Sequence, residues 1–224
     1  MKRSTFGVLT AVLSVGTMLL AAGSASGAVI YTTESSFQAA IAPGYYLEEF
    51  SACGSWGLHA SPASFGPVNG WQYDVSTSWG GLWGLNSNKG GGGCISTEWP
   101  DPLLTITPTG SQQVTAIGGW FFATDWDGAV MAATIHVELS DGTILSYTSS
   151  ASAYDFRGFT STVPITSLSI SIPGNPHDKN YYGAYPSLDH VYIGVPVPEP
   201  ATLAILAMGF VSLIRNNCRL PTRP

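Results

Sequence analysis

Residues 136–147 read His-Val-Glu-Leu-Ser-Asp-Gly-Thr-Ile-Leu-Ser-Tyr. Apolar and polar side chains alternate on both sides of Asp141 and Gly142, as they do in strands that bury only one face. An Asp-Gly pair accepts the positive φ angles of a tight turn. This stretch therefore predicts an antiparallel β-hairpin.

Similar short β patterns recur along the chain, separated by Gly, Pro, Asn and Asp. We expect further strands at 46–50, 70–75, 103–107, 114–123, 165–172 and 190–193. Helical periodicity is found at 35–42, where Phe37 and Ile41 stand four apart and Thr33 or Ser35 is placed to cap the start. Many short antiparallel strands with one helix predict an all-β protein, a jelly-roll-like sandwich with one short N-terminal helix.

The N-terminal residues 1–28 have the pattern of a secretory signal peptide. Lys2 and Arg3 form a basic start, a mostly apolar run follows at 8–22, and small residues close the segment. Such segments direct export and are removed from the mature protein. We therefore expect a single exported domain at 29–194, which is large enough to bury a core.

The C-terminal residues 195–224 combine a Pro-rich stretch, an apolar run and a basic end. As a helix, the apolar run at 201–214 would span about 21 Å, less than the roughly 30 Å of a bilayer core. The basic end at 215–224 is expected to stay on the cytoplasmic side. Its arginines are Arg215, Arg219 and Arg223. This short hydrophobic helix predicts transient retention in the inner membrane, and an ordinary short anchor that stays uncut is the alternative.

The motif Pro198-Glu199-Pro200 precedes this hydrophobic segment. Motif, segment and basic end together resemble the PEP-CTERM sorting signal of exported proteins of Gram-negative bacteria. The resemblance implies an exosortase of the inner membrane as processing partner, which cuts near the motif and passes the protein on to the surface. The basic end departs from the tight arginine cluster frequent in that family.

Four segments of the second half carry a further resemblance. They read Ala-Ile-Gly-Gly-Trp-Phe-Phe-Ala-Thr-Asp at 116–125, Phe-Arg-Gly-Phe at 156–159, Pro-Ile-Thr-Ser-Leu at 164–168 and Tyr-Pro-Ser-Leu-Asp-His-Val-Tyr-Ile-Gly at 185–194. Their order resembles the β-sandwich ectodomain that often accompanies PEP-CTERM tails, which is itself similar to carbohydrate-binding jelly rolls. A shared fold leaves the function open.

The charge of the expected domain excludes nucleic acid as a ligand. Residues 29–194 hold three basic side chains, Lys89, Arg157 and Lys179, against thirteen acidic ones, which gives a formal charge of −10. So few basic groups cannot replace the counterions of a phosphate backbone. An acidic surface instead suits solubility outside the cell or the binding of divalent cations.

Residues 51–102 are rich in Trp, Gly, Ser and Asn, which predicts a long, loop-rich insertion. Cys53 and Cys94 fall within it, in a domain expected to meet oxidising conditions. We therefore expect a disulfide between them, which would contribute on the order of 4 kcal/mol in the chain-entropy model. A catalytic role for Cys53 is disfavoured, because no recognisable local motif surrounds it.

The tryptophans of this insertion suggest a site for sugars, whose rings stack on flat apolar faces. Trp79, Trp83 and Trp99 are the predicted glycan-binding residues, and Trp79 and Trp83 are the expected exposed pair. The amides that would bind sugar hydroxyls, and the remaining tryptophans of the group, are Asn69, Asn86, Asn88, Trp56 and Trp71. The alternative is that these rings form a core, because Trp buries a large area wherever it packs.

Asp125 and Asp127 stand two apart, and Asp189 precedes the last predicted strand. Calcium prefers carboxylate and carbonyl oxygens as ligands. Because similar-looking jelly rolls commonly carry a structural calcium ion, the resemblance implies calcium as a possible cofactor bound by these three residues. The alternative is an Asp-Gly turn with solvated carboxylates.

The sequence favours a protein without catalytic activity. Glu48 and Glu49 are neighbours on a predicted strand and therefore face opposite ways. Glu98 and Asp101 meet only if a loop brings them together. The four histidines are scattered without metal-binding spacing, and neither a Gly-x-Ser-x-Gly elbow nor a phosphate-cradling glycine loop is present.

These patterns lead to three hypotheses about function. The first is a non-catalytic exported protein of the cell surface or an exopolysaccharide matrix, sorted through its C-terminal signal. The alternative is an extracellular glycan-binding module that holds a polysaccharide with its Trp-rich loops. The third is a glycan-active enzyme.

Overall fold

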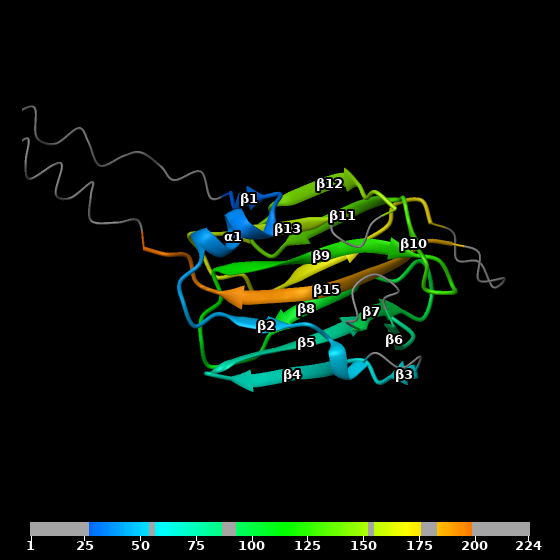
Figure 1. Cartoon of the computed structure of the whole chain (residues 1–224), viewed down its shortest axis with the longest axis horizontal. Coiled ribbons are helices and arrows are strands. Elements are labelled where there is room, and N and C mark those ends of the chain that lie inside the picture. The colour runs from blue at the N-terminus through cyan, green and yellow to red at the C-terminus, as the bar shows by residue number, and fades with distance from the viewer. Residues whose placement is uncertain (1–26, 54–56, 87–92, 152–154, 176–182, 199–224) are drawn as a thin grey trace, which may run out of the picture.

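The computed structural model describes residues 27–53, 57–86, 93–151, 155–175 and 183–198. Within these ranges the chain forms two antiparallel β-sheets that pack face to face, with one short helix against the larger sheet (Figure 1). The all-β sandwich that the sequence predicts is confirmed.

The larger sheet has nine strands in the order β1-β13-β9-β15-β7-β6-β3, with β10 paired to β9 and β2 paired to β15. Their bounds are β1 Val29–Tyr31, β2 Tyr46–Glu48, β3 Gly57–His59, β6 Leu82–Asn86, β7 Gly93–Thr97, β9 Ala116–Thr124, β10 Val130–Met131, β13 Phe156–Thr160 and β15 Tyr185–Gly194. Strand β15 pairs with β9 along one edge and, along the other edge, first with β7 and then with β2. It is the central strand of the sheet.

The smaller sheet has six strands in the order β12-β11-β14-β8-β5-β4. Their bounds are β4 Ala63–Val68, β5 Trp71–Thr77, β8 Leu104–Pro108, β11 Thr134–Leu139, β12 Ile144–Thr148 and β14 Leu168–Ser171. The predicted hairpin is β11 with β12, in which Glu138 lies opposite Ile144. In its turn Gly142 has a φ of +86° and donates its N–H to the Leu139 carbonyl at 3.0 Å.

From β8 onward the chain alternates between the two sheets. Strand β9 lies in the larger sheet, β11 and β12 in the smaller, β13 in the larger, β14 in the smaller and β15 in the larger. Each crossing adds the new strand beside a partner that is distant in sequence, which is typical of jelly rolls.

Apolar side chains of alternating strand positions fill the space between the sheets. Phe121 and Leu188 of the larger sheet and Val137 of the smaller are fully buried in this common core. Burial of each such side chain contributes about 1.5 to 3 kcal/mol. In β14, Leu168 and Ile170 are buried, whereas the alternating Ser169 and Ser171 are half-buried, as the pattern predicts.

The helix α1 (Glu34–Ala40) covers one end of the outer face of the larger sheet. The Thr33 hydroxyl caps it by accepting a hydrogen bond from the Ser36 N–H at 3.3 Å. Phe37 is fully buried beneath it, over Gly158 of β13. The chain also ends beside this helix in the described range, because the Val197 N–H donates to the Ala40 carbonyl at 2.8 Å.

The loop-rich insertion predicted at 51–102 is wrong for the described part of that segment. It forms the 3₁₀ turn η1 (Ser51–Cys53) and strands β3 to β7, which contribute to both sheets. Glycine conceals these strands in the sequence, because it is depleted in strands generally. At Gly84 of β6 the absence of a side chain is required, since a Cβ there would lie 2.2 Å from the Cys53 carbonyl oxygen.

The predicted disulfide is also wrong, because Cys53 and Cys94 are both free thiols. Cys94 lies on the outer face of the larger sheet, in a cluster with Leu85 and Phe122. Cys53 packs instead against the core between the sheets. The two side chains therefore occupy opposite faces of the β6–β7 pair. Burial raises the pKa of the Cys94 thiol well above its usual value.

The close contact between Phe37 of α1 and Gly158 of β13 predicts that a methyl group added at Gly158 destabilises the protein. In Gly158→Ala the new Cβ would lie 2.4 Å from Phe37 Cδ2, so we expect the free energy of unfolding to fall by about 1 to 3 kcal/mol, the usual cost of overpacking. Urea denaturation measures the change. Ser35→Ala, at an exposed position of α1 itself, is the control, and equal stability of the two variants would contradict this packing.

Candidate functional site

The outer face of the larger sheet, which points away from the core, is divided into two regions. At one end α1 covers a cluster around Phe37, Phe156 and Tyr192. At the other end the sheet carries Leu85, Cys94 and Phe122 with the partly buried Trp83, Trp120 and Val130. The helix does not extend over this second region (Figure 1).

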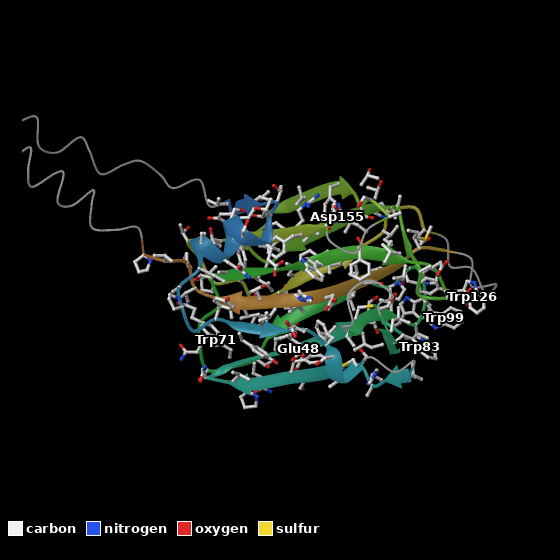
Figure 2. The ribbon with its side chains drawn as sticks, in the orientation of Figure 1. Glu48, Trp71, Trp83, Trp99, Trp126 and Asp155 are labelled. Carbon is white, nitrogen blue, oxygen red and sulfur yellow. The ribbon has the colours of Figure 1, made fainter. Side chains whose placement is uncertain are left out.

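A cavity of about 360 Å³ opens in the second region, and we call it the aromatic pocket. Three aromatic side chains line it, Trp83 of β6, Trp126 after β9 and Tyr185 of β15. The other lining residues are Leu85, Ser96, Thr97, Glu98, Thr124 and Asp125. Figure 2 shows Trp83, Trp99 and Trp126 gathered at this end of the sandwich.

Strand register brings these residues together from distant parts of the chain. Trp83 of β6 lies opposite Ser96 of β7, and Thr124 of β9 lies opposite Tyr185 of β15. Trp83 and Leu85 are two apart on one strand and therefore share a face. The walls of the aromatic pocket are thus fixed by the pairing of four strands.

Buried hydroxyl groups form the floor beneath these rings. Ser187 Oγ donates to Ser96 Oγ at 2.9 Å, and Thr124 Oγ1 shares a hydrogen bond with Ser187 Oγ at 3.1 Å. Ser96 Oγ in turn donates to the Pro186 carbonyl at 3.2 Å. All three hydroxyl side chains are buried. Because their hydrogen bonds are made within the chain, they hold three strands in fixed register below the pocket.

A turn between β9 and β10 places Trp126 at the rim. Asp125 Oδ1 accepts hydrogen bonds from the N–H groups of Asp127 at 3.0 Å and Ala129 at 2.8 Å. Gly128 completes the turn with a φ of +79°. The Trp126 side chain is 58% exposed. Asp125 therefore orders the backbone that carries the exposed ring.

Glu98 connects the aromatic pocket to a second pair of rings. Its Oε2 accepts a hydrogen bond from the Gly81 N–H at 2.8 Å. The neighbouring Trp99 stacks on Trp79, with ring centroids 5.7 Å apart and planes inclined by 28°. Trp79 is 38% exposed. This stacked pair lies next to the pocket, because Glu98 and Trp99 both pack against Gly80.

The sequence identified part of this site. Trp83 lines the pocket and Trp99 stands beside it. Of the two rings expected to be exposed, Trp79 is exposed and stacks on Trp99, whereas Trp83 is half-buried. Trp71 is buried and donates its indole N–H to the Gly44 carbonyl at 2.8 Å, as the core alternative predicts.

Of the remaining predictions for this site, the structure describes the position of Asn69. Asn69 lies in the exposed turn between β4 and β5 of the smaller sheet. Trp56, Asn88 and the side chain of Asn86 lie outside what the structure describes. Sequence reasoning missed Trp126 and Tyr185, because the first sits in an Asp-rich turn and the second begins a strand whose partners are distant in sequence.

The three aspartates predicted to bind calcium do not come together. Asp189 lies opposite Trp120 in the middle of β9, whereas Asp125 follows the last residue of that strand. Asp127 is exposed on the turn. Within the described ranges, no group of three or more His, Cys, Asp or Glu side chains is arranged to hold a metal ion. The Asp-Gly turn, the alternative from the sequence, describes Asp125 correctly.

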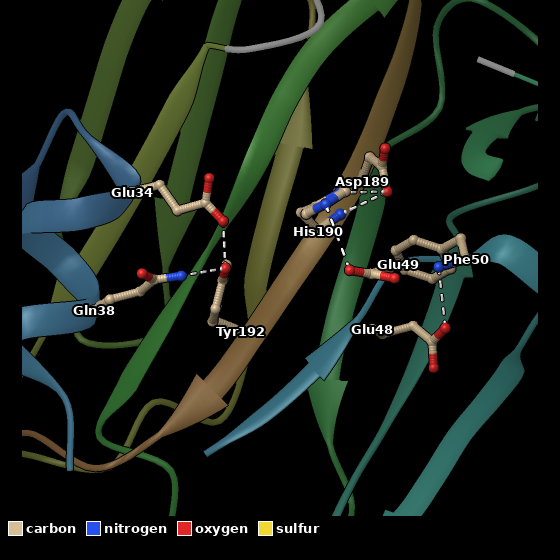
Figure 3. A network of polar contacts seen from close by, with 8 residues as sticks. All are labelled: Glu34, Gln38, Glu48, Glu49, Phe50, Asp189, His190 and Tyr192. Carbon is tan, nitrogen blue, oxygen red and sulfur yellow. Dashed lines mark hydrogen bonds and ion pairs between the residues drawn. The ribbon is translucent and has the colours of Figure 1, made fainter. Parts of the chain in front are cut away.

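Asp189 belongs instead to a network that holds the centre of the outer face (Figure 3). Its side chain is only 3% exposed, and its Oδ1 accepts a hydrogen bond from the His190 N–H at 2.7 Å. The same oxygen lies 3.1 Å from His190 Nδ1. The His190 ring stacks on Trp120 with centroids 3.7 Å apart. Its Nε2 lies 3.9 Å from Glu49 Oε1, so the network joins the segment after β2 to β15.

The backbone at this place is irregular. Strand β15 shifts its register against β9 between Asp189 and Tyr192, and His190 has a φ of +49°, which is uncommon for a residue with a side chain. Burial favours a lower pKa for His190, but the contact with Asp189, supported by Glu34 and Glu49, outweighs it and raises that pKa above 6.5.

Further along β15, the network ties α1 to the sheet (Figure 3). The Tyr192 hydroxyl donates to Glu34 and accepts a hydrogen bond from Gln38 Nε2 at 2.7 Å. Glu48 accepts a hydrogen bond from the Phe50 N–H at 3.0 Å, whereas Glu49 faces His190. The two glutamates point in different directions, as the strand pattern predicts.

Comparisons with known proteins add little to this geometry. No protein-family model matches the chain, and no curated protein matches it. Among solved structures, the chain is similar to CsCBM6-3 from Clostridium stercorarium, determined in complex with cellobiose. The two share 17% identity, the match covers 64% of this chain and 95% of that chain, and the TM-score is 0.28. A likeness this slight supports no inference about a ligand.

The predicted export signals fall almost entirely outside the described residues. These are the signal peptide up to residue 26, Glu199, Pro200, the apolar run at 201–214 and the basic end. Pro198 is described and follows β15 without regular structure. The described part of the chain contains no helix of the length and apolarity that a membrane crossing requires.

The His190 contacts predict how stability depends on pH. A histidine whose pKa is raised in the folded state adds stability that is complete below its unfolded pKa of about 6.5 and is lost as the pH rises through the folded value. We therefore expect His190→Gln to destabilise the protein most at pH 6, and the deficit to shrink toward pH 9. Urea denaturation at each pH measures it. His136→Gln on the smaller sheet is the control, and a deficit at His190 that grows with pH would refute the assignment.

Proposed function

We propose that the domain is a non-catalytic module that binds a glycan in the aromatic pocket. The pocket itself carries the proposal. Its volume of about 360 Å³ falls within the range of ligand sites, about 300 to 1,000 Å³. Rings from three separate strands or turns converge on it, and sugars present apolar faces that suit such rings.

The polar groups at the rim suit the other requirement of sugar recognition, which is hydrogen bonding to hydroxyl groups. Carboxylate oxygens are strong acceptors for hydroxyl donors. Glu98 and Asp125 each use one oxygen to order a neighbouring turn and stand at the pocket with fixed backbone. A site preformed in this way loses little conformational entropy when it binds.

The proposal predicts that an exposed ring is needed for binding and not for folding. In Trp126→Ala we expect the affinity for the best of a panel of neutral glucose, mannose and N-acetylglucosamine oligosaccharides to fall about fivefold to 160-fold, because stacking contributes about 1 to 3 kcal/mol by analogy with other ring-on-aromatic contacts. The melting temperature should stay unchanged. Isothermal titration calorimetry and thermal melts measure the two quantities.

A matched control separates loss of the site from general loss of exposed apolar surface. Ile144 on β12 of the smaller sheet is also 58% exposed, and Ile144→Ala should bind as the wild type does. Binding that survives both Trp126→Ala and Trp83→Ala would exclude the aromatic pocket as the site.

We also propose that the protein is exported and sorted through its C-terminal signal, and the sequence pattern supports this second part. A basic and apolar start at 1–28 suits secretion. Pro198-Glu199-Pro200, the apolar run and the arginines behind it suit recognition by an exosortase-type enzyme in the inner membrane of a Gram-negative-type bacterium. The destination would be the cell surface or an extracellular polysaccharide matrix.

Processing of this kind has a direct readout in the mass of the mature protein. In a host that has the processing enzyme, we expect the C-terminus to lie close to Pro198 and the peptide at 215–224 to be missing. Mass spectrometry of surface-released protein measures both. Replacement of Glu199 by Gln should reduce processing, and a mature protein that still ends at Pro224 would refute the sorting proposal.

A further inference from the structure

We propose that the aromatic pocket selects sugars that carry a free, positively charged amine, such as the units of a deacetylated amino-sugar polymer. This inference rests on the proposed function and specifies its ligand. It follows from two properties of the pocket, the sign of its charged groups and the convergence of its rings.

The charged side chains that line the pocket are all acidic. Glu98 and Asp125 are the two carboxylates among its nine described lining residues, which include no Lys, Arg or His. Among the described residues 29–194, the basic side chain is that of Arg157 on β13. It lies away from the pocket, with its guanidinium carbon 3.8 Å from the centroid of the Tyr147 ring. A ligand with carboxylate or sulfate groups would meet like charge here, whereas an ammonium group would meet opposite charge.

The aromatic rings act in the same direction. The face of an indole ring attracts a cation, and the attraction is stronger for Trp than for Tyr or Phe. Two indoles and one phenol line the same cavity as the two carboxylates. A sugar amine placed among them gains a cation–π contact that a hydroxyl or an acetamide group at the same position does not make.

The charge of the ligand gives the inference a pH signature. The electron-withdrawing oxygens of a sugar ring bring the pKa of an attached amine close to that of an α-amino group, about 7.7 to 8.0. Such an amine is charged at pH 6 and mostly neutral at pH 9. Affinity for the amine should therefore fall over this interval, while affinity for a neutral sugar of the same length should change far less.

The test compares three oligosaccharides of equal length, built from glucosamine, N-acetylglucosamine and glucose. At pH 6 and low salt we expect glucosamine oligomers to bind about twofold to thirtyfold more tightly than the other two, the range that one cation–π contact provides. Isothermal titration calorimetry gives the dissociation constants, and the preference should shrink at pH 9 and in high salt.

Two variants assign the preference to the pocket. Glu98→Gln and Asp125→Asn keep an oxygen that accepts the turn hydrogen bonds and remove the charge. Each should weaken binding of the amine by about twofold to fivefold, as for a partly exposed ion pair, with no loss for the glucose oligomer. Glu138→Gln, an exposed carboxylate on β11 of the smaller sheet, is the matched control and should change neither affinity.

The outcomes separate this inference from the proposed function. Equal binding of all three oligomers, or a preference that Glu98→Gln and Asp125→Asn leave intact, would overturn the inference and leave the glycan site standing. Failure of all three oligomers to bind, together with failure of the neutral panel, would overturn the proposed function itself.

Discussion

The pairing of β15 with β9 is the interaction on which the rest of the structure depends. These two long strands lie side by side through the middle of the larger sheet. Their inward side chains, such as Phe121 and Leu188, fill the core, and their outward side chains form the floor on which both α1 and the aromatic pocket rest. A one-residue slip in this pair would exchange the two faces and remove core and site together.

The pairing of β15 with β9 is interrupted at one place, and a network of side chains stabilises it there. The register shift between Asp189 and Tyr192 turns a carboxylate and an imidazole toward each other within a strand that is otherwise regular. Asp189 is buried with a raised pKa, because burial disfavours its charge more than the His190 contact favours it. The stacked Trp120 ring and the nearby Glu49 hold the histidine in place. The network thus stabilises a local departure from ideal pairing.

How well the sequence predicted the fold depended on how local each interaction is. The β11–β12 hairpin and α1 were found because their signals lie within a few residues, in Asp141-Gly142 and in the Thr33 cap. Strands β6 and β7 pair with each other but were missed, because glycine interrupts their pattern and β7 has its second partner in the distant β15. The disulfide was wrong because sequence spacing does not show on which face of a sheet a thiol lies.

For the candidate site too, residue types were predicted from the sequence, whereas contacts between distant strands were not. Trp83 was found as a type of residue that binds sugars, but its partners Trp126 and Tyr185 reach it only through the register of β6, β7, β9 and β15. Asp125 was singled out for its nearby carboxylate, and in the structure one of its oxygens accepts two backbone hydrogen bonds.

The direction of β15 places the aromatic pocket and the C-terminal end of the described chain at opposite ends of the domain. The strand begins at Tyr185 in the aromatic pocket and ends at Gly194. Three residues later, Val197 donates its backbone N–H to the carbonyl of Ala40 at the end of α1. Ten residues of strand separate the two places by roughly 30 Å at 3.3 Å per residue. A support attached after Val197, whether a bead, a fusion partner or a cell envelope, would therefore hold the domain at the end opposite the aromatic pocket and leave the pocket open to the medium.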